Sequence, residues 1–367
     1  MKFNEMKQDC RYFAGYIPCR PNKMYNALCI ENEIPCKYYS KVKEKILIIK
    51  LGAAGDVIRT TPLLHKIQSE YPDSYVYWIT QFPDLIPQKS IDNIGADKIY
   101  NWELNSLITL QNMEFDLVIN LDKDEQACSL AKSLKSQKYS GYTLVNNKPS
   151  PFDEKANHKF LTGVFDEISK ANKKNYMEEI FDICGFSYNK EEYILPDYDL
   201  VTKYNIDSSK IIVGLNTGCG GRWTSRLWPE KYWLELISSL KKENYEVVIL
   251  GGPEEDEKNL RISSSTNTKY FGVMPLKKFI GLMDKCDIIV SAVTMGMHIA
   301  IGLKKKLVLL NNIFNKNEFV LYGRGEIIEP SKECTCYFSP TCKNENYKCI
   351  EYIEPQRVLK AVKNQIK

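Results

Sequence analysis

Several signals that would place this 367-residue chain in a membrane or nucleic-acid-binding class are missing from its sequence. No run approaches the roughly 18 apolar residues that a membrane-spanning helix needs. The N-terminal segment MKFNEMKQDCRYF lacks the apolar core of a signal peptide. The net charge of +4 is slight for this length and gives no electrostatic case for nucleic acid. We therefore expect a cytoplasmic enzyme or binding protein, with at most peripheral membrane contact.

Common catalytic and cofactor motifs are missing as well. The chain has no Walker loop, no zinc-hydrolase pattern and no nucleophile elbow. Its first glycine turn reads GAAGDV instead of G-x-G-x-x-G, so a dinucleotide cofactor has little support. The sequence thus predicts chemistry that needs no cofactor for catalysis.

Cysteine, in contrast, is abundant. Eight of the twelve cysteines form two groups of four near the ends of the chain: Cys10, Cys19, Cys29 and Cys36, and Cys334, Cys336, Cys342 and Cys349. In a reducing compartment such groups bind metal more often than they form disulfides, so each group is a candidate structural zinc or iron site. Neither group has a C-x-x-C pair, and buried free thiols are the alternative for both.

The first half of the chain reads as alternating strands and helices. Residues 46–49 form an apolar run typical of a strand buried on both faces. Gly52 and Gly55 follow it in a turn, and Asp56 precedes a helical pattern. Further strands are expected at 74–80, 96–102 and 115–122, and an amphipathic helical region is expected at 157–184.

The pattern loosens at 194–210, which predicts an interdomain linker, and then restarts. Strands are expected at 211–215 and 307–312, with strand–loop–helix units at 246–257 and 286–303. This alternation predicts an α/β protein with two Rossmann-like domains, whose ligands bind beyond the carboxyl ends of the strands. The expected parts are a Cys-rich extension (1–44), a first domain (45–205), a second domain (206–330) and a Cys-containing tail with a C-terminal helix (331–367).

The second domain places phosphate-binding side chains in its strand-to-helix loops. The first loop, NTGCGGRWTSR, supplies Thr217, Gly221, Arg222 and Arg226. Arginine forks suit phosphate oxygens, although surface arginines beside tryptophans are the plainer interpretation.

Two later loops carry further donor-binding candidates, namely Glu254, Glu255, Thr294, Gly296 and His298. A carboxylate at 254 or 255 binds ribose hydroxyls or favours a helix N-terminus. Loop amides with Thr294 suit phosphate, and a structural role is the alternative for His298.

Four segments in order carry a resemblance: KLGAAGDVIRTTPLL, RLWPEKYW, ILGGPEEDE and TMGMHIAIGLKKK. Together they resemble glycosyltransferase family 9, the family of the ADP-heptose:lipopolysaccharide heptosyltransferases, over roughly residues 45–330. The resemblance implies the GT-B fold of two Rossmann-like domains facing across a cleft. It also implies an inverting transfer without a metal at the sugar, with the nucleotide-sugar donor held by the C-terminal half.

Residue by residue, the resemblance makes Asp56 the catalytic base. Gly55, directly before it, is a further donor-binding candidate. Arg226 stands where many members have lysine and would neutralise the departing diphosphate, and Thr294, Gly296 and His298 fall in the phosphate-binding loop. Val293 replaces the usual aspartate, which leaves the donor sugar and base open. The tail cysteines are similar to those of the iron-binding autotransporter heptosyltransferases, which implies a metal there.

The leading hypothesis is an inverting glycosyltransferase for cell-surface glycan biosynthesis. It would move heptose or a similar sugar from a nucleotide donor to a glycan, lipid-linked or protein acceptor. A GT-B nucleotide-sugar epimerase and a non-catalytic nucleotide-sugar binding protein are the alternatives, and an oligomer is compatible with each.

Overall fold

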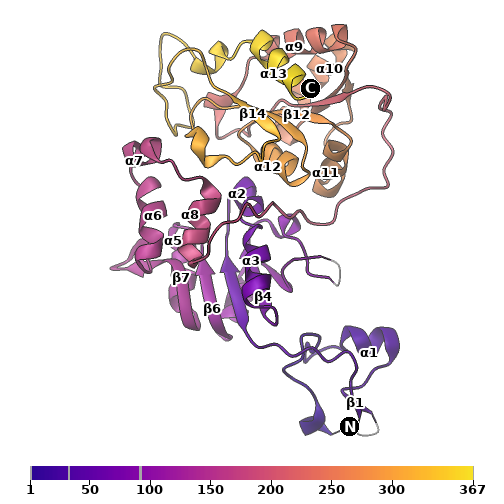
Figure 1. The fold of residues 1–367 in the computed structure, drawn as a ribbon, viewed down its shortest axis with the longest axis vertical. Helices are drawn as coiled ribbons and strands as arrows, with labels where there is room; N and C mark the ends of the chain where they lie inside the picture. Colours follow the sequence, from indigo (N-terminus) through magenta and orange to yellow (C-terminus); the bar gives the residue numbers. More distant parts are fainter. Residues whose placement is uncertain (1, 32–33, 91–92, 367) are drawn as a thin grey trace. The chain divides into compact units, whose positions relative to one another are not determined.

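The computed structural model describes residues 2–31, 34–90 and 93–366, which divide into two compact units (Figure 1). Unit 1 comprises Met1–Leu51, Leu63–Pro83 and Gln88–Phe152, and unit 2 comprises Gly52–Pro62, Asp84–Pro87 and Asp153–Lys367. These boundaries differ from the expected domains, because short pieces of the first half and all of 153–205 pack with the second. Among the described residues, no helix has the length and apolar character to cross a bilayer.

Unit 1 contains a six-stranded sheet with the order β5-β4-β3-β6-β7-β8. All neighbours are parallel except β7 and β8, which form an antiparallel hairpin. The strands are β3 (Lys45–Ile49), β4 (Tyr75–Thr80), β5 (Lys98–Asn101), β6 (Glu114–Asn120), β7 (Lys135–Val145) and β8 (Lys148–Pro151). The four apolar residues of β3 are fully buried, as the apolar run at 46–49 predicts. Each such side chain contributes about 1.5–3 kcal/mol to folding.

Along the chain, three helices connect the strands of unit 1: α3 (Leu63–Glu70), α4 (Leu104–Gln111) and α5 (Glu125–Ser133). A short 3-10 turn at Pro83–Leu85 marks the point where the chain passes from unit 1 to a segment of unit 2. Leu110, Leu130 and Phe115 pack in a core cluster on one face of the sheet. The hairpin of β7 and β8 was not expected from the polar text of 126–150. Its turn uses Asn146 and Asn147, both at positive φ, a conformation that asparagine tolerates.

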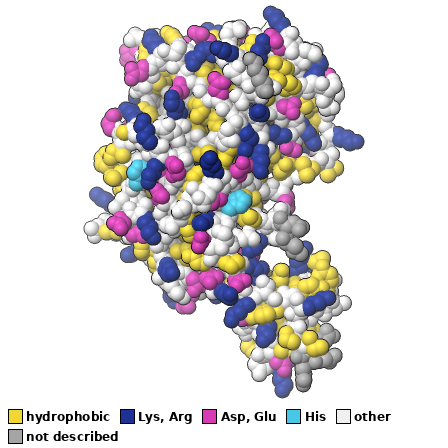
Figure 2. Space-filling view, viewed as in Figure 1, with side chains coloured by type: hydrophobic (Ala, Val, Ile, Leu, Met, Phe, Trp, Pro, Cys, Tyr) yellow, Lys and Arg dark blue, Asp and Glu magenta, His cyan; other side chains and the backbone are white. Residues whose placement is uncertain are grey.

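The N-terminal extension precedes this sheet and has little regular structure. It contains η1 (Phe3–Glu5), α1 (Arg20–Tyr25) and the two-residue strands β1 (Ile30–Glu31) and β2 (Ile34–Pro35). Arg11 joins the extension to the sheet region of unit 1 through an ion pair with Asp97 and a 2.7 Å hydrogen bond to the Ser74 carbonyl. Apolar side chains are prominent on its surface (Figure 2), as expected for a segment too short for a core of its own.

Unit 2 contains a second six-stranded sheet, with the order β11-β10-β9-β12-β13-β14 and parallel neighbours throughout. Its strands are β9 (Ile212–Asn216), β10 (Glu246–Leu250), β11 (Lys269–Tyr270), β12 (Ile288–Ala292), β13 (Lys306–Leu310) and β14 (Gly325–Ile328). Numbered within each unit, both sheets have the order 3-2-1-4-5-6 of the dinucleotide-binding fold. The prediction of two Rossmann-like sheets is confirmed.

The helices of unit 2 include α9, whose first turn follows Pro229 as predicted. The helices are α2 (Ala54–Ile58), α6 (Asn157–Thr162), α7 (Asp166–Ala171), α8 (Tyr176–Cys184), α9 (Glu230–Lys242), α10 (Asp256–Thr266), α11 (Leu276–Asp284), α12 (Met295–Gly302) and α13 (Pro355–Asn364), with 3-10 turns at Glu154–Ala156, Thr224–Arg226, Pro253–Glu255, Lys316–Glu318 and Cys349–Tyr352. Trp228 and Trp233, edge-to-face at 4.7 Å, anchor α9 in the core. Unit 2 therefore encloses a core of its own.

Two expectations for this region need correction. The helical region at 157–184 is three separate helices, and its predicted buried face is partly exposed at Leu161, Val164 and Phe165. The predicted linker at 194–210 has no helix or strand, yet it packs within unit 2. The backbone of Asp199 approaches Gly281 so closely that a Cβ there would lie 2.0 Å from the Asp199 oxygen.

Candidate functional site

Asp56 lies on α2, the short helix that follows β3. The chain turns through Gly52, and Asp56 falls in the first turn of α2, where the free backbone N–H groups favour a carboxylate. Its side chain is 34% exposed, and its Oδ1 lies 2.7 Å from Nη2 of Arg59. A guanidinium at this distance favours the ionised carboxylate. Asp56 is therefore an accessible anion that is able to accept a proton.

Arg59 is held from several sides. Its side chain is 12% exposed, its guanidinium carbon lies 3.4 Å from the ring centroid of Tyr176 on α8, and Nη1 lies 3.8 Å from Glu318 Oε2. Burial alone lowers the pKa of Arg59, but Asp56, Tyr176 and Glu318 outweigh it and the net pKa is raised. Arg59 is thus a permanent cation that fixes Asp56. The Asp-x-x-Arg spacing on a helix was a signal for this pair.

Gly55 lies against His298 of α12. A Cβ on Gly55 would be 2.5 Å from Cδ2 of that ring, so only glycine fits. His298 is buried, its ring stacks on Tyr193 with centroids 6.0 Å apart, and its Nδ1 lies 3.5 Å from the Tyr193 hydroxyl. Burial lowers the pKa of His298 to about 3, assisted by the charge of Arg59. A neutral imidazole is a poor phosphate ligand, but it is a good packing partner for α2.

Thr294 caps α12. Its Oγ1 accepts hydrogen bonds from the Gly296 N–H at 3.2 Å and from Nδ2 of Asn216 at 3.0 Å. A Cβ on Gly296 would lie 2.7 Å from Asn216 Nδ2, so this glycine permits the close approach of β9 and α12. Asn216 also donates to Ser291 Oγ at 2.9 Å. Sequence reasoning missed Asn216, whose signal was a polar residue at the carboxyl end of an apolar strand.

Arg226 is buried in unit 2 without an acidic partner. It donates to the carbonyl oxygens of Val293 and Cys219, the latter at 3.2 Å, and its guanidinium carbon lies 5.2 Å from the Trp223 ring centroid. Nε has no hydrogen-bond partner, and no ion pair joins Arg226 to any carboxylate in the described chain. Burial lowers the pKa of Arg226 to about 10. A buried cation without a countercharge is costly unless an anion binds beside it.

The two glutamates predicted to bind the donor accept hydrogen bonds from backbone amides of the glycine-rich loop. Glu254 accepts a hydrogen bond from the Gly221 N–H. Glu255 is buried and accepts from Gly220 N–H at 3.4 Å and Gly252 N–H at 3.0 Å. The N–H of Gly221, a predicted donor contact, is therefore bonded to Glu254.

Two further predicted donor contacts lie in the same loop. The hydroxyl of Thr217 is buried and donates to Oδ1 of Asn259 at 2.5 Å. Arg222 is exposed, with its guanidinium carbon 5.8 Å from the Trp223 centroid. Their role in donor binding stays a prediction.

The elements around α12 bring most of these residues together. Gly55 contacts His298 in the first turn of α12, Thr294 caps the same helix, and Arg226 bonds to Val293 just before it. All of them belong to unit 2. The predicted base and the predicted diphosphate residues are therefore built around one strand-to-helix junction.

Two of the tail cysteines form a close pair, with Sγ of Cys336 and Sγ of Cys342 3.7 Å apart. The Cys334 thiol lowers the pKa of Cys349 to about 6. Four sulfurs each about 2.3 Å from a tetrahedral ion would lie about 3.8 Å apart. The Cys336–Cys342 distance is close to this spacing.

The N-terminal cysteines are arranged differently. All four are free and partly exposed, and the Cys36 N–H donates to the Cys29 carbonyl at 2.9 Å. Within the described parts of the chain, no three His, Cys, Asp or Glu residues are arranged as the ligands of one ion. The metal predictions at both ends therefore stay predictions.

Several glycosyltransferases are among the solved structures similar to this chain. A family 9 glycosyltransferase from Veillonella parvula has a TM-score of 0.68 at 16% identity, covering 89% of this chain and 97% of that one. Escherichia coli heptosyltransferase WaaC, solved with ADP-2-deoxy-2-fluoro heptose, has a TM-score of 0.58 at 14% identity, covering 87% and 99%. The iron-containing dodecameric TibC of enterotoxigenic E. coli has a TM-score of 0.50 at 13% identity, covering 89% and 79%. At these identities the likeness shows the fold, which is GT-B.

Sequence comparison points to the same group of enzymes as the structural comparison. Lipopolysaccharide heptosyltransferase 1 of Pseudomonas aeruginosa is 22% identical over 357 aligned residues, covering 86% of this chain and 96% of that protein. The model of "Glycosyltransferase family 9 (heptosyltransferase)" matches residues 107–348, well over half of the chain. The chain belongs to glycosyltransferase family 9.

Proposed function

We propose that this protein is an inverting glycosyltransferase that moves heptose, or a closely similar sugar, from a nucleotide-diphosphate donor to a glycan or lipid-linked acceptor. The observation that carries the proposal is Arg226, a buried guanidinium with an unused Nε and no acidic partner in the described chain. A diphosphate is the anion that would complete it, because a guanidinium fork matches two phosphate oxygens.

The chemistry follows from Asp56 and Arg226. Asp56 takes the proton of the acceptor hydroxyl as its oxygen attacks the anomeric carbon, and the bond from that carbon to the diphosphate oxygen breaks. Arg226 stabilises the charge that develops on the diphosphate. Arg59 keeps Asp56 ionised before the attack. One attack on the face opposite the leaving group inverts the anomeric carbon.

The names of relatives support an ADP-linked heptose donor and a lipopolysaccharide-type acceptor. WaaC was solved with an ADP-heptose analogue, and the P. aeruginosa relative is a lipopolysaccharide heptosyltransferase. Val293 modifies this expectation. Its side chain is buried and its carbonyl accepts from Arg226, so the family's usual carboxylate is replaced by an apolar wall.

The free thiols throughout the chain fit a reducing cytoplasm as the site of action.

A thermal-shift screen of ADP-, GDP-, UDP-, CDP- and dTDP-sugars tests the donor, because a ligand that binds only the folded state raises its stability. We expect an ADP-linked heptose to give the largest shift.

Asp56→Asn should keep that shift and lose about 10²–10⁴-fold in turnover, as general-base mutants do. Asp166→Asn, at an exposed position on α7, is the matched control. Unchanged turnover in Asp56→Asn would refute the assignment of the base.

We further propose a structural zinc or iron ion in the tail, held by Cys334, Cys336, Cys342 and Cys349. The sulfur spacing of the Cys336–Cys342 pair fits a tetrahedral ion, and Cys334 and Cys349 lie in the same short segment. The N-terminal cysteines are a second candidate on their spacing alone. Elemental analysis of protein purified without added metal should give about one ion per intact four-cysteine site. Cys336→Ser should remove one equivalent, and metal-free wild-type protein would refute both sites.

A further inference from the structure

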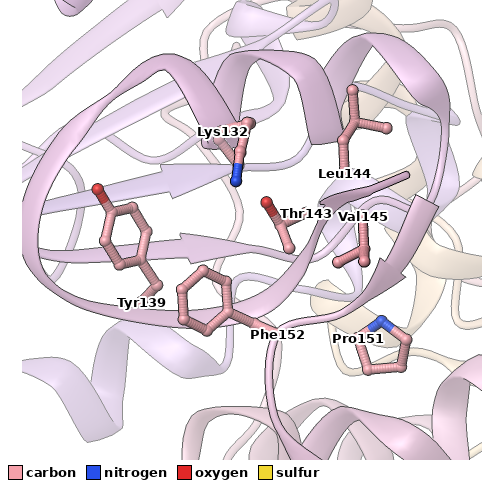
Figure 3. Close-up of a pocket in the computed structure, with 8 residues that line it drawn as sticks. Lys132, Tyr139, Thr143, Leu144, Val145, Pro151 and Phe152 are labelled. Carbon is pink, nitrogen blue, oxygen red and sulfur yellow. The ribbon is translucent and has the colours of Figure 1, made fainter. Parts of the chain in front are cut away.

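A cavity of about 360 Å³ opens between α5 and the β7–β8 hairpin of unit 1 (Figure 3). Lys132 of α5, Thr143 and Tyr139 of β7, and Phe152 beyond β8 line it, and Pro151 lies on the same wall. The volume is at the lower end of the roughly 300–1,000 Å³ found for ligand sites, which suits one or two sugar rings. None of these residues belongs to the site around α12.

Two polar groups face this cavity without partners. Thr143 is 6% exposed, and its hydroxyl makes no hydrogen bond with any described residue. Lys132 is exposed and has no ion pair in the described parts of the chain. Figure 3 shows the Lys132 ammonium and the Thr143 hydroxyl pointing toward one another. The Thr143 hydroxyl lines the cavity without a partner in the described part of the protein, so it can donate or accept a hydrogen bond with a ligand.

An aromatic surface completes the cavity. The rings of Tyr139 and Phe152 stack with centroids 4.9 Å apart and an interplanar angle of 16°. The Tyr139 hydroxyl donates to the Leu134 carbonyl at 2.7 Å and accepts from the Ser136 N–H at 3.0 Å, which fixes the pair. Phe152 is 45% exposed, so part of its ring is open. The electron-rich face of such a ring attracts the C–H groups of a sugar.

The cavity lies along α5 and the hairpin. Lys132 is in the last turn of α5 and Tyr139 is in the first half of β7, while Thr143 follows Gly141, where β7 leaves β6 and pairs with β8. We propose that this cavity is an acceptor subsite for a sugar ring that carries a carboxylate or phosphate group. Phe152 stacks on the ring, Thr143 donates or accepts one hydrogen bond, and Lys132 pairs with the anion. The inference rests on the proposed transferase function.

Saturation-transfer NMR on the full chain, without donor, tests the subsite with three probes. Methyl glucuronide and glucose 6-phosphate carry the two candidate anions, and methyl glucoside is the neutral counterpart. We expect wild type to favour one or both charged probes, and the preferred probe identifies carboxylate or phosphate. Lys132→Gln should weaken the binding of that probe about fivefold, the upper range for an exposed ion pair, and leave the binding of the neutral probe unchanged. Phe152→Leu should weaken the binding of all three probes.

Lys98→Gln is the matched control, because Lys98 is exposed on β5, at the other edge of the sheet from the hairpin. Equal binding of charged and neutral probes by wild type, or an unchanged preference in Lys132→Gln, would overturn the subsite. Donor binding is measured separately by thermal shift. If the donor binds and the charged probes do not, the subsite fails alone. If no nucleotide sugar binds, the proposed function fails, whatever the probes do.

Discussion

Two arginines of unit 2, Arg59 and Arg226, differ in whether the surrounding side chains neutralise their charge. Arg59 contacts the carboxylates of Asp56 and Glu318 and the ring of Tyr176, and its pKa is raised. Arg226 contacts backbone carbonyls and aromatic rings, and burial lowers its pKa to about 10. A charge that the protein neutralises itself serves the structure. We propose that the charge left unneutralised, that of Arg226, binds the donor diphosphate.

The largest expected effect comes from Arg226→Gln. Loss of the guanidinium should lower turnover by about 10²–10³-fold, as removal of one transition-state donor does. The unfolding free energy should stay within about 1 kcal/mol of wild type or rise above it, since an uncompensated buried charge is removed. Steady-state kinetics and urea unfolding measure the two quantities. Arg222→Gln, at an exposed position, is the control. A large loss of stability with normal turnover would make Arg226 structural.

Arg59→Gln should behave in the opposite way. Removing it leaves Glu318 and Asp56 without their cation, and breaking a fully buried pair costs about 3–5 kcal/mol. Because Asp56 is one-third exposed, we expect about 2–3 kcal/mol. The acidic limb of the turnover–pH profile should also move to higher pH, since loss of the cation raises the pKa of the base. A profile that coincides with wild type would separate Arg59 from the chemistry.

Gly55→Ala tests the contact that holds α2 to α12. The new methyl group would lie 2.5 Å from the His298 ring, so the helices must separate. Overpacking of this kind costs about 1–3 kcal/mol. Gly55→Ala/His298→Ala should recover part of the loss, because the smaller side chain makes room. Thermal unfolding of the single and double variants gives the coupling, and strict additivity would show that the ring is not the obstacle.

The smallest effect, taken over a single pH unit, is a dependence of stability on pH. His298 has a folded pKa of about 3, below the value of about 6.5 expected in the unfolded chain. The unfolded state therefore binds the proton first. Stability is complete above about pH 6.5 and falls by up to about 1.4 kcal/mol per pH unit as the pH drops toward 4. Urea unfolding at several pH values should show this slope in wild type and not in His298→Gln. His65→Gln, on α3, is the control and should show the same slope as wild type.

Much of the fold could be predicted because apolar periodicity is local. The run at 46–49 and the glycine turn after it are signals within a few residues, and they predicted β3 correctly. Asp56 was expected just ahead of one helix, but it lies within the short helix α2, and the rest of that pattern forms the separate helix α3. The break of the helical region at 157–184 depended on which side chains found a core, which periodicity does not reveal. Likewise, Glu318 and Tyr176 meet Arg59 only in the folded chain, since more than a hundred residues separate each from it. The Asp56–Arg59 pair was accessible from spacing and was overlooked.

The discontinuity of unit 2 has a consequence for exchanging parts between members of the family. A fragment that starts at Asp153 carries the whole β9–β14 sheet and lacks α2, so the face of His298 that Gly55 covers would be open to water. A chimera joined at that point would pair α2 of one parent with α12 of another. Residues 52–62 should instead travel with 153–367, so that the carboxylate, its arginine and the helix they rest on come from a single parent.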